Sequence, residues 1–386
     1  MMRVMTIFGT RPEAIKMAPV VHALRAAPDI EDIVCVTAQH RDMLDQVLEL
    51  FGITPDHDLD VMEHGQSLHG VTAKIIQLLQ PVLEQSRPDM VLVHGDTATC
   101  FAASLAAFYS RVPIGHVEAG LRTKDLTAPF PEEGFRQLTD RLCELYFAPT
   151  ARSASTLLTE GVNPQRIVTT GNTVIDALLW MKDRLPPLQT PEQIYGSAAD
   201  IFENSDAPVV LVTGHRRESF GKGFEQICTA LRELARKHPD VQIVYPVHLN
   251  PRVQEPVHRL LAKIDSIHLI PPLDYQGFVR LMNRATLILT DSGGIQEEAP
   301  SLNKPTLVMR EKTERPEGVD AGVVKLVGTN PEKIVAETSR LLSNPEAFKD
   351  MSERANPYGD GTAAQQIVAA LRAWWLHQTS TAGPKP

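Results

Sequence analysis

Residues 289–318, LTDSGGIQEEAPSLNKPTLVMREKTERPEG, contain the stretch on which the fold prediction rests. A short apolar run, 286–289, ends at Asp291-Ser292-Gly293-Gly294, and a helix-like segment follows at once. This order predicts a strand, a tight turn without bulky side chains and the start of a helix. Backbone N–H groups at a helix start have no partner within the helix, so they stabilise an anion such as a phosphate. The stretch therefore predicts a phosphate site.

The same turn also allows a purely structural interpretation. Ser292 is of a residue type that often caps a helix, and two glycines suit a tight turn whether or not a ligand binds. In the functional interpretation, the glycines let the ligand approach the backbone, and Glu297 and Glu298 accept the two hydroxyls of a ribose. Both interpretations stay open on these residues alone.

Length and composition indicate a globular protein of about two domains. The 386 residues exceed one ordinary core, and 43% hydrophobic with 22% charged residues is usual for a folded chain. The net charge of −9 disfavours nucleic acid or an acidic membrane as a partner, since both attract a basic surface. An anionic substrate must therefore meet a local cluster of Arg, Lys and His.

The sequence also favours a cytoplasmic protein. It begins with a short strand instead of a signal-peptide segment, and no apolar run approaches the roughly 18 residues of a membrane span. The cysteines have no zinc-site spacing, so we expect them to be small buried residues. They are Cys35, Cys100, Cys143 and Cys228.

Short β-branched runs alternate with helical patterns, which predicts parallel βαβ units. The expected strands are 4–8, 33–37, 90–94, 113–117 and 145–148 in the first half, and 209–213, 242–247, 267–270, 286–289 and 306–309 in the second. A Pro-started helix is expected over 12–27. We therefore predict an α/β fold with two doubly wound parallel-sheet domains, whose ligands lie at the carboxyl ends of the strands.

We place the domain boundaries from composition and turn signals. The first domain spans 1–172 and the second 173–361, with a hinge region within 173–207 that includes Pro186-Pro187 and Asn204-Ser205-Asp206. The helix after the turns at 356–361 packs either on its own domain or back on the first one. Residues 379–386 are too polar and too rich in Gly and Pro to fold.

Carboxylates follow two strands of the first half. Asp96 and Glu118 should project into one crevice, and a third acid, Glu132 or Glu133, lies in a loop leading into Arg136. Three carboxylates beside a phosphate site suggest proton transfer at an atom of the ligand. Each of them alone has the alternative of a helix cap or half of an ion pair.

A metal site is the competing interpretation, since His94-x-Asp96 and His116-x-Glu118 look like ligand pairs. Alternate residues share a face only while a strand continues, however, and no further cluster completes a two-metal set. Acid–base chemistry without a metal is therefore the favoured interpretation.

Cations follow strands in both halves. Arg11 and Lys16 flank the first turn of the first expected helix, and Arg216-Arg217 has guanidinium groups that suit bidentate phosphate contact. Arg310 and Arg315 follow the strand after the Ser-Gly-Gly turn. We expect this positive charge to lie around the phosphates, with ordinary solvated surface charges as the alternative.

Together, segments from Phe8 to about Gly361 resemble the non-hydrolysing UDP-N-acetylglucosamine 2-epimerases. They are FGTRPEAIKMAP, TAQHRDMLDQVL, LVHGDTATC, GHVEAGLRT, PEEGFRQLTDRL, TGNTVIDAL, TGHRRESFGKGF, VYPVHLNP, LTDSGGIQEEAPSLNKP, TERPEG and NPYGDG. The resemblance implies a GT-B-like fold with the active site in the cleft between two Rossmann-like domains, and a C-terminal helix, 362–378, that crosses back to the first domain. It also implies reversible conversion of UDP-GlcNAc to UDP-ManNAc, no metal or nicotinamide cofactor, and a homodimer.

The resemblance implies a role for individual residues as well. It implies that Ser292, Gly293 and Gly294 bind the diphosphate, with His215 and Arg315 near the phosphates. Glu298 would contact the ribose, and Phe278 and the backbone of Leu273 would contact the base. Arg11 and Lys16 would lie on the sugar side. The catalytic acids are Asp96, Glu118 and Glu132, and His215 helps to stabilise the leaving diphosphate. The segment departs from the family at Phe135, where Asn is more usual, so this position is left out of the site.

The expected chemistry is anti elimination. The C2 proton is not acidic until the C1–O bond to UDP loosens; a carboxylate then takes it, giving 2-acetamidoglucal and UDP, which add back after reprotonation on the other face. The product would supply ManNAc for cell-surface polysaccharide. A GT-B glycosyltransferase, a non-catalytic UDP-sugar sensor and a hydrolysing relative are the alternatives, and the sequence does not assign one carboxylate to each face.

Overall fold

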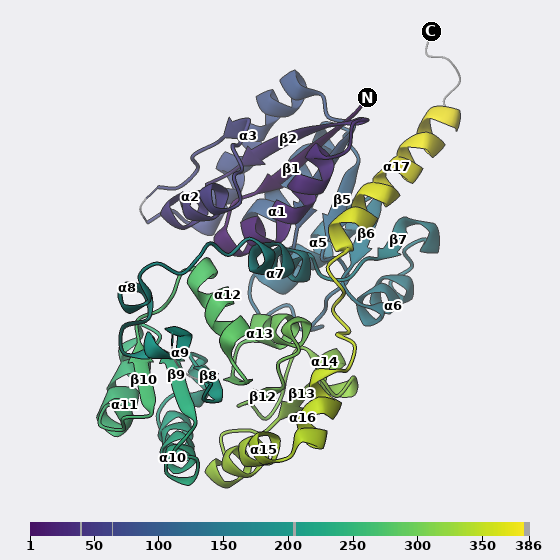
Figure 1. The fold of residues 1–386 in the computed structure, drawn as a ribbon. Helices are drawn as coiled ribbons and strands as arrows, with labels where there is room; N and C mark the ends of the chain where they lie inside the picture. The colour runs from purple at the N-terminus through teal and green to yellow at the C-terminus, as the bar shows by residue number, and fades with distance from the viewer. Residues whose placement is uncertain (39–40, 64, 204–205, 382–386) are drawn as a thin grey trace. The chain divides into compact units, whose positions relative to one another are not determined.

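The structure, a computed structural model, describes residues 1–38, 41–63, 65–203 and 206–381 of the chain. The chain divides into two compact units (Figure 1). Unit 1 consists of Met1–Ala177 and the chain from Tyr358 onward, and unit 2 consists of Leu178–Pro357. Each unit is built around one parallel sheet.

The sheet of unit 1 has the strand order β3-β2-β1-β4-β5-β6-β7, with every pair parallel. Its strands are β1 (Met2–Phe8), β2 (Ile30–Val36), β3 (His57–Asp58), β4 (Met90–His94), β5 (Ile114–Val117), β6 (Leu145–Ala148) and β7 (Ile167–Thr169). This is the Rossmann order, in which the chain reverses direction across the sheet between β1 and β4. Ligands of such sheets bind at the carboxyl ends of the strands beside that reversal.

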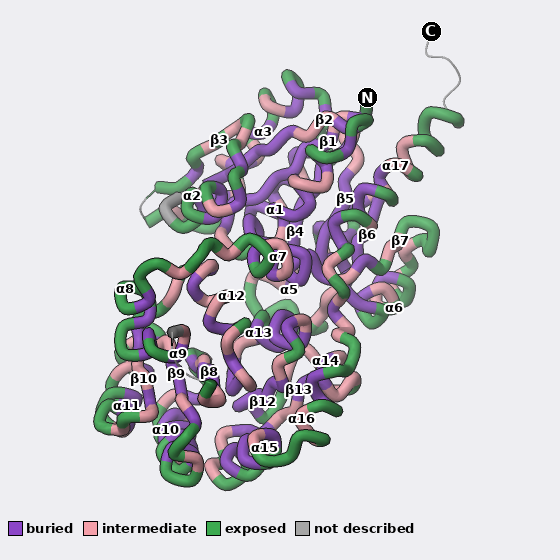
Figure 2. The backbone as a smooth tube through the Cα atoms, viewed as in Figure 1, coloured by how far each residue is buried: buried purple, intermediate pink, exposed green. Residues whose placement is uncertain are grey.

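Helices connect the strands of unit 1. They are α1 (Arg11–Arg25), α2 (Arg41–Leu50), α3 (Leu68–Ser86), α4 (Ala98–Tyr109), α5 (Glu132–Leu142), α6 (Ala151–Thr159), the first part of α7 (Thr173–Asp183) and α17 (Ala363–Thr381), with a 3-10 turn at Pro164–Arg166. Successive residues of a strand face opposite sides, so Met5 and Ile7 of β1 pack on one side with Ile75 and Leu79 of α3. Figure 2 shows the resulting buried strands beneath partly exposed helices.

The sheet of unit 2 repeats this topology in the order β10-β9-β8-β11-β12-β13. Its strands are β8 (Val209–Thr213), β9 (Gln242–Pro246), β10 (Ile267–Ile270), β11 (Leu287–Thr290), β12 (Thr306–Val308) and β13 (Val324–Leu326). The reversal here lies between β8 and β11. Val210 and Val212 of β8 pack against Phe224 and Leu231 in the core.

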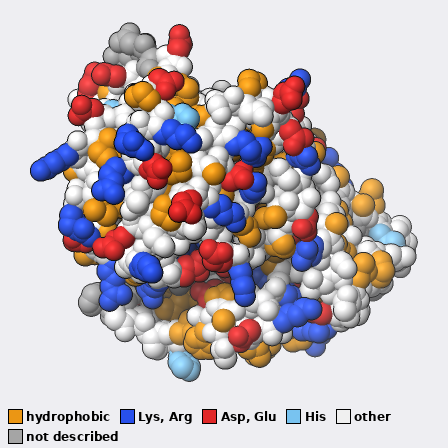
Figure 3. All heavy atoms as spheres, turned by 90° about the horizontal axis from the view of Figure 1, so that it is seen from below, with side chains coloured by type: hydrophobic (Ala, Val, Ile, Leu, Met, Phe, Trp, Pro, Cys, Tyr) orange, Lys and Arg blue, Asp and Glu red, His pale blue; other side chains and the backbone are white. Residues whose placement is uncertain are grey.

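The helices of unit 2 complete the alternation. They are the second part of α7, then α8 (Pro191–Tyr195), α9 (Asp200–Glu203), α10 (Lys222–Lys237), α11 (Pro251–Leu261), α12 (Tyr275–Arg284), α13 (Gly293–Glu298), α14 (Pro316–Asp320), α15 (Pro331–Ser343) and α16 (Pro345–Ser352). Short 3-10 turns lie at Gly196–Ala198, Arg217–Ser219 and Ala299–Leu302. On the face seen in Figure 3, positive and negative side chains are interspersed.

The predicted pair of doubly wound parallel sheets is confirmed, and the differences lie at the edges. The sequence missed β3, β7 and β13, which have only two or three residues each. The four cysteines are buried and free, as expected. No helix in the described ranges combines the length and the apolar character that a membrane crossing needs. Residues 39–40, in the segment TAQHRDMLDQVL, and residues 204–205 of the expected hinge lie outside the described residues.

The C-terminal helix α17 packs within unit 1, next to α1. Its first turn is fixed by Asp176 of α7, whose carboxylate accepts hydrogen bonds from Ala363 N at 3.3 Å and Ala364 N at 2.8 Å. Farther along, Arg372 pairs with Asp29 at 2.9 Å. The helix continues to Thr381. The expectation that residues 379–386 are unfolded is therefore wrong for residues 379–381, which belong to the helix. Residues 382–386 lie outside the described chain.

The substitution Asp176→Ala should loosen α17. It removes the acceptor for two N–H groups at the helix start, and loss of such a cap costs about 1 kcal/mol. We expect a lower free energy of unfolding and faster hydrogen exchange across the first turns of α17. Asp183→Ala, an exposed position at the end of α7, is the matched control and should change neither. Unchanged exchange in α17 of the Asp176 variant would contradict this account.

Candidate functional site

In unit 1, one buried carboxylate connects the two loops at the reversal of the sheet. Thr10 is the N-cap of α1 and forms a capping box with Glu13. The Glu13 carboxylate accepts hydrogen bonds from Gly9 N at 3.1 Å, Thr10 N at 2.8 Å and Thr97 Oγ1 at 2.6 Å. Burial raises the pKa of Glu13, although these hydrogen bonds oppose that change. The capping-box pattern was present in the sequence, but the link to Thr97 beyond β4 was not.

The two predicted acids at neighbouring strand ends meet on one arginine. Asp96 follows β4 and Glu118 follows β5, and the buried Arg136 of α5 lies between them. Arg136 Nη2 is 2.5 Å from Asp96 Oδ2 and 3.3 Å from Glu118 Oε1, and Nη1 donates to the Glu118 carbonyl at 2.5 Å. The expected convergence of Asp96 and Glu118 is therefore present within unit 1. The sequence pattern did not indicate this role of Arg136.

Glu118 has further partners on its second oxygen. Lys16 of α1 forms an ion pair with Oε2, and Asn172 Nδ2 donates to the same atom at 3.2 Å. His94 Nε2 lies 3.7 Å away. Two cations and an amide offset the cost of burying this carboxylate, which is only 6% exposed. Lys16, predicted on the sugar side, thus reaches the site through its contact with Glu118.

The backbone at Glu118 is in the left-handed region, with φ of +68°. This conformation is unfavourable for a residue with a side chain by roughly 1–2 kcal/mol. The hydrogen bond from Arg136 to the Glu118 carbonyl and that from Glu118 N to Phe147 O, at 3.1 Å, hold the residue there. Such local strain is often found where a side chain must take a particular direction.

The remaining predicted residues of unit 1 lie at two helix starts. Glu132 begins α5 four residues before Arg136, so the two share a helix face. Its Oε2 atom is buried and has no hydrogen-bond partner among the described residues. Glu133, the alternative third acid, instead accepts from the backbone of residues 123 and 124, at 3.0 Å each. Arg11 begins α1, is half-buried, and has no described carboxylate within ion-pair distance.

The histidines that suggested a metal site have different surroundings. Burial lowers the pKa of His94 to about 3, so its ring is neutral at physiological pH. His116 Nδ1 is 2.6 Å from Asp140 Oδ1, and Nε2 is 2.8 Å from the Gly95 carbonyl. His116 therefore supports the loop before Asp96 and does not pair with Glu118. The described ranges contain no group of three or more His, Cys, Asp or Glu side chains arranged to hold a metal ion.

In unit 2, the Ser-Gly-Gly turn follows β11 as predicted. Ser292 occupies the N-cap position of α13, but its side chain makes no capping hydrogen bond. Its N–H donates to Thr290 Oγ1 at 3.0 Å. The structural interpretation of Ser292 as a side-chain cap is therefore not observed. Gly294 lies close to Glu298, since a Cβ added to Gly294 would be 3.4 Å from Glu298 Oε1.

Asp291 connects this turn to the loop after β8. The buried carboxylate accepts from His215 N at 2.7 Å and from Arg216 N at 2.8 Å. The His215 ring has Nδ1 at 3.3 Å from Asp291 Oδ1 and stacks on His248 with ring centroids 5.6 Å apart. Partial burial lowers the pKa of His215 and the charge of Arg216 adds to this, while Asp291 opposes it. No sequence pattern indicated that Asp291 accepts hydrogen bonds from the loop after β8.

The arginines near the turn differ in their pairing. Arg310 is buried and donates to Glu218 at 2.5 Å and to Glu314 at 2.8 and 3.0 Å. Arg315 pairs with the buried Glu297. Arg310 and Arg315, which were expected to add positive charge around the phosphates, are thus each paired with a carboxylate. Glu297 is occupied by this pair, which leaves Glu298 as the glutamate beside Gly294.

The residues expected around the base lie on and just before α12. Leu273 precedes the Asp274 N-cap, and Phe278 lies in the first turn; both are half-buried. Burial raises the pKa of Tyr275 in the same turn, and the charge of the nearby Glu298 raises it further. The elements expected to contact base and ribose are therefore neighbours within unit 2.

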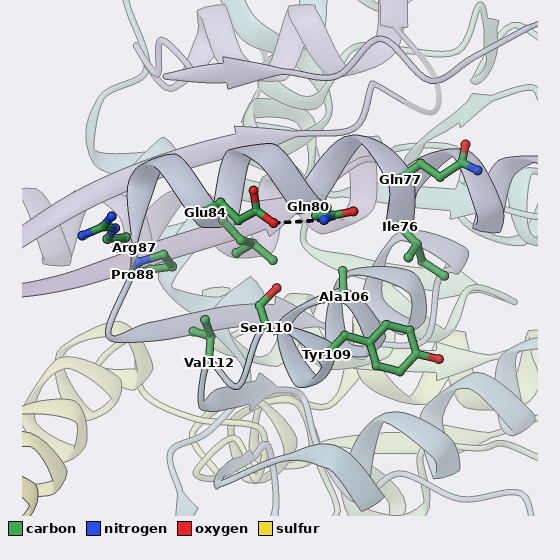
Figure 4. Close-up of a pocket in the computed structure, with 11 residues that line it drawn as sticks. Ile76, Gln77, Gln80, Glu84, Arg87, Pro88, Ala106, Tyr109, Ser110 and Val112 are labelled. Carbon is green, nitrogen blue, oxygen red and sulfur yellow. Dashed lines mark hydrogen bonds between the residues drawn. The ribbon is translucent and has the colours of Figure 1, made fainter.

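A cavity of unit 1 lies away from these residues. A cavity of about 730 Å³ lies between α3 and the end of α4 (Figure 4). It is lined by polar and apolar side chains, including Gln77, Gln80, Glu84, Arg87 and Tyr109. None of the predicted site residues lines it. This cavity is therefore separate from the predicted site residues of unit 1.

Comparison with known proteins finds similar chains over nearly the whole length. UDP-N-acetylglucosamine 2-epimerase of Yersinia pestis is 61% identical over 372 residues, 96% of this chain and 98% of that protein. UDP-GlcNAc 2-epimerase of Neisseria meningitidis, solved with UDP-GlcNAc bound, is 50% identical with a TM-score of 0.85, over 96% of this chain and 100% of that chain. S. aureus MnaA, solved with UDP, is 48% identical with a TM-score of 0.82, over 100% and 99%.

These structures share the fold over nearly the whole chain, which confirms the predicted GT-B-like class of two Rossmann-like domains. The sequence profile described as UDP-N-acetylglucosamine 2-epimerase matches residues 22–372. The chain belongs to the UDP-N-acetylglucosamine 2-epimerase family.

Proposed function

We propose that this chain interconverts UDP-GlcNAc and UDP-ManNAc by reversible epimerisation at C2 of the sugar, without net hydrolysis. The observation that supports this most directly is the cluster in which Asp96 and Glu118 meet on Arg136. It places two carboxylates together at the carboxyl ends of β4 and β5, where sheets of this topology bind ligands. The relative from Neisseria meningitidis, whose structure holds UDP-GlcNAc, has half of its residues in common with this chain.

Unit 2 would bind the UDP part. The backbone of Ser292, Gly293 and Gly294 would hold the diphosphate, and Glu298, next to Gly294, would accept the ribose hydroxyls. The remaining contacts would come from Phe278 and the backbone of Leu273 on the base, and from His215 and Arg315 near the phosphates. Arg11 and Lys16 of unit 1 would contact the sugar side.

The proposed reaction begins with departure of UDP. The electron pair of the C1–O bond leaves with the diphosphate, and a carboxylate removes the C2 proton, so that a C1=C2 double bond forms. The intermediates are 2-acetamidoglucal and UDP. A carboxylic acid on the opposite face returns a proton to C2, and the diphosphate oxygen adds back to C1. No oxidant, reductant or cofactor is required, because bonds and charges balance within the two steps.

The carboxylates supply the proton transfers. Arg136 donates hydrogen bonds to both Asp96 and Glu118, and Glu132 adds a third carboxyl group on the same face of α5 as Arg136. Inversion at C2 needs an acid or base on each face of the sugar, which explains why more than one carboxylate is required. His215, with its lowered pKa, would donate to the leaving diphosphate as a neutral ring.

We further propose a cytoplasmic homodimer whose product supplies ManNAc for cell-surface polysaccharide. A nucleotide sugar released intact, and not as free ManNAc, is a donor that a glycosyltransferase uses directly. This is the reason for assigning the non-hydrolysing reaction to a biosynthetic pathway.

Incubation with UDP-GlcNAc in D2O tests the proposed reaction. Solvent deuterium should appear at C2 of both epimers, because the proton lost to a carboxylate exchanges before return. Proton NMR of the nucleotide sugars measures this directly. Converted product that still carries hydrogen at C2 would rule out the elimination route.

The same incubation separates the alternatives. Free ManNAc with UDP would identify a hydrolysing enzyme, and UDP released only on addition of an acceptor would identify a glycosyltransferase. Binding of UDP-GlcNAc without conversion would identify a sensor. Each of these results contradicts the proposed epimerase.

The substitution Asp96→Asn should impair catalysis more than binding. It preserves the shape of the side chain but removes a proton-transfer group, which is typically worth 10²- to 10⁴-fold in rate. We expect kcat to fall by about that factor while the affinity for UDP stays within about twofold, since UDP contacts unit 2. Steady-state kinetics and UDP titration measure the two quantities. Asp183→Asn is the control, and equal activity of the two variants would remove Asp96 from the mechanism.

His94 predicts a pH limit for unit 1. Its pKa is about 3 in the folded chain and about 6.5 when unfolded, so the unfolded state takes up a proton first as the pH falls. The free energy of unfolding is therefore unaffected by protonation of His94 above about pH 6.5. It falls as the pH is lowered from 6.5 to 3, by at most about 1.4 kcal/mol per pH unit.

The measurement is the free energy of urea unfolding, with hydrogen exchange in β4 and β5 as the readout. It is made on the native chain and on His94→Asn. The stability difference between them should shrink as the pH is lowered from 7 to 5. His69→Asn, at an exposed position of α3, should show no such trend. A difference for His94→Asn that stays constant with pH would contradict the assignment of a depressed pKa.

A further inference from the structure

We propose that Arg216 binds the diphosphate beside Gly293 and stabilises the charge that develops on UDP as it leaves the sugar. This inference rests on the proposed function, to which it adds a residue that the resemblance did not supply. The observation behind it is the position and pairing of the Arg216 side chain.

Arg216 is fixed next to the Ser-Gly-Gly turn through its backbone. Its N–H donates to the buried Asp291 at 2.8 Å, and Asp291 directly precedes the turn. Its guanidinium reaches back over the turn: Nη2 lies 3.6 Å from the point that a Cβ on Gly293 would occupy. The missing side chain of Gly293 therefore leaves room between the guanidinium and the backbone of the turn.

Arg216 differs from Arg310 and Arg315 in its charge balance. Arg310 is held by Glu218 and Glu314, and Arg315 by Glu297. Arg216 has no ion pair with any residue in the described part of the chain, and its buried Nε atom has no hydrogen-bond partner there.

A carboxylate on which the charge of Arg216 acts is already occupied. The charge of Arg216 acts on Glu314, yet both carboxylate oxygens of Glu314 accept from Arg310. Buried guanidinium N–H groups are nearly always paired in folded proteins. An unpaired one beside a turn that is proposed to hold phosphate indicates that its partner is the ligand.

A guanidinium suits this ligand chemically. Its planar N–H groups can donate to two phosphate oxygens at once. Breaking the C1–O bond adds negative charge to the terminal phosphate of UDP, so a nearby cation interacts more strongly with UDP than with UDP-GlcNAc. An interaction that strengthens as the bond breaks lowers the barrier to the reaction. We therefore assign Arg216 to the leaving group and not to general attraction of the substrate.

The test compares Arg216→Met with Arg232→Met. Arg232 is exposed on α10 of the same unit, so the control loses the same charge and gains the same side chain. Isothermal titration with UDP, UDP-GlcNAc and uridine measures three affinities for each protein. For Arg216→Met we expect a loss of about 10- to 100-fold for UDP, a smaller loss for UDP-GlcNAc, and a change within about twofold for uridine, which has no phosphate.

Two further measurements keep a folding defect apart from a lost contact. The melting temperature of Arg216→Met should match that of the native chain, and Arg216→Lys should recover part of the UDP affinity because it retains the charge. Steady-state kinetics of Arg216→Met should show a fall in kcat as well as in kcat/KM.

Particular results would overturn the inference. If the native chain binds UDP but Arg216→Met binds it equally well, Arg216 is not a phosphate contact and the proposed function is untouched. An equal loss for uridine and UDP would mean that Arg216 only supports the fold. If the native chain binds neither UDP nor UDP-GlcNAc, the proposed function fails first, and this inference fails with it.

Discussion

The ion pairs of Arg136 with Asp96 and Glu118 are the constraint on which unit 1 depends. Two carboxylates at neighbouring strand ends repel each other, and each resists removal from water. The buried guanidinium offsets both effects, while Lys16 and Asn172 satisfy the remaining oxygen of Glu118. Removing Arg136 or Glu118, the two buried members, typically costs about 3–5 kcal/mol, because it leaves an unpaired buried charge. The stability of unit 1 and the geometry of its candidate acids therefore depend on the same contacts.

Both units use a buried carboxylate to connect the two loops at the reversal of the sheet. In unit 1, Glu13 joins the loop after β1 to Thr97 after β4. In unit 2, Asp291 after β11 accepts from the backbone of the loop after β8. These strand pairs occupy equivalent places in the two sheets. A loop that must present N–H groups and cations to a ligand has few hydrogen bonds of its own, and an internal acceptor compensates for that loss.

Sequence patterns predicted the elements that are set by local chemistry. Strands β4, β6, β8 and β10 have the predicted bounds because short apolar runs end at clear turn signals. The edge strand His57–Asp58 has no such run and forms only because its neighbour offers free backbone groups. The convergence of Asp96 and Glu118 followed from strand order. Their meeting on Arg136 did not, since it depends on a helix about 20 to 40 residues away and on the left-handed backbone at Glu118.

Counting arginines near the turn overestimates the unpaired positive charge there, because some of them are paired with carboxylates. Arg310 and Arg315 are near the turn in sequence, but Glu218, Glu314 and Glu297 neutralise them. The pair of Arg310 with Glu218 joins residues 92 positions apart, which no sequence window reveals. The paired arginines hold the loops in place. The positive electrostatic potential at the turn then depends on backbone N–H groups and on cations that form no ion pair with a carboxylate. A chain with a net charge of −9 can therefore bind a diphosphate without a basic surface, provided that a few donors beside the turn are left unpaired.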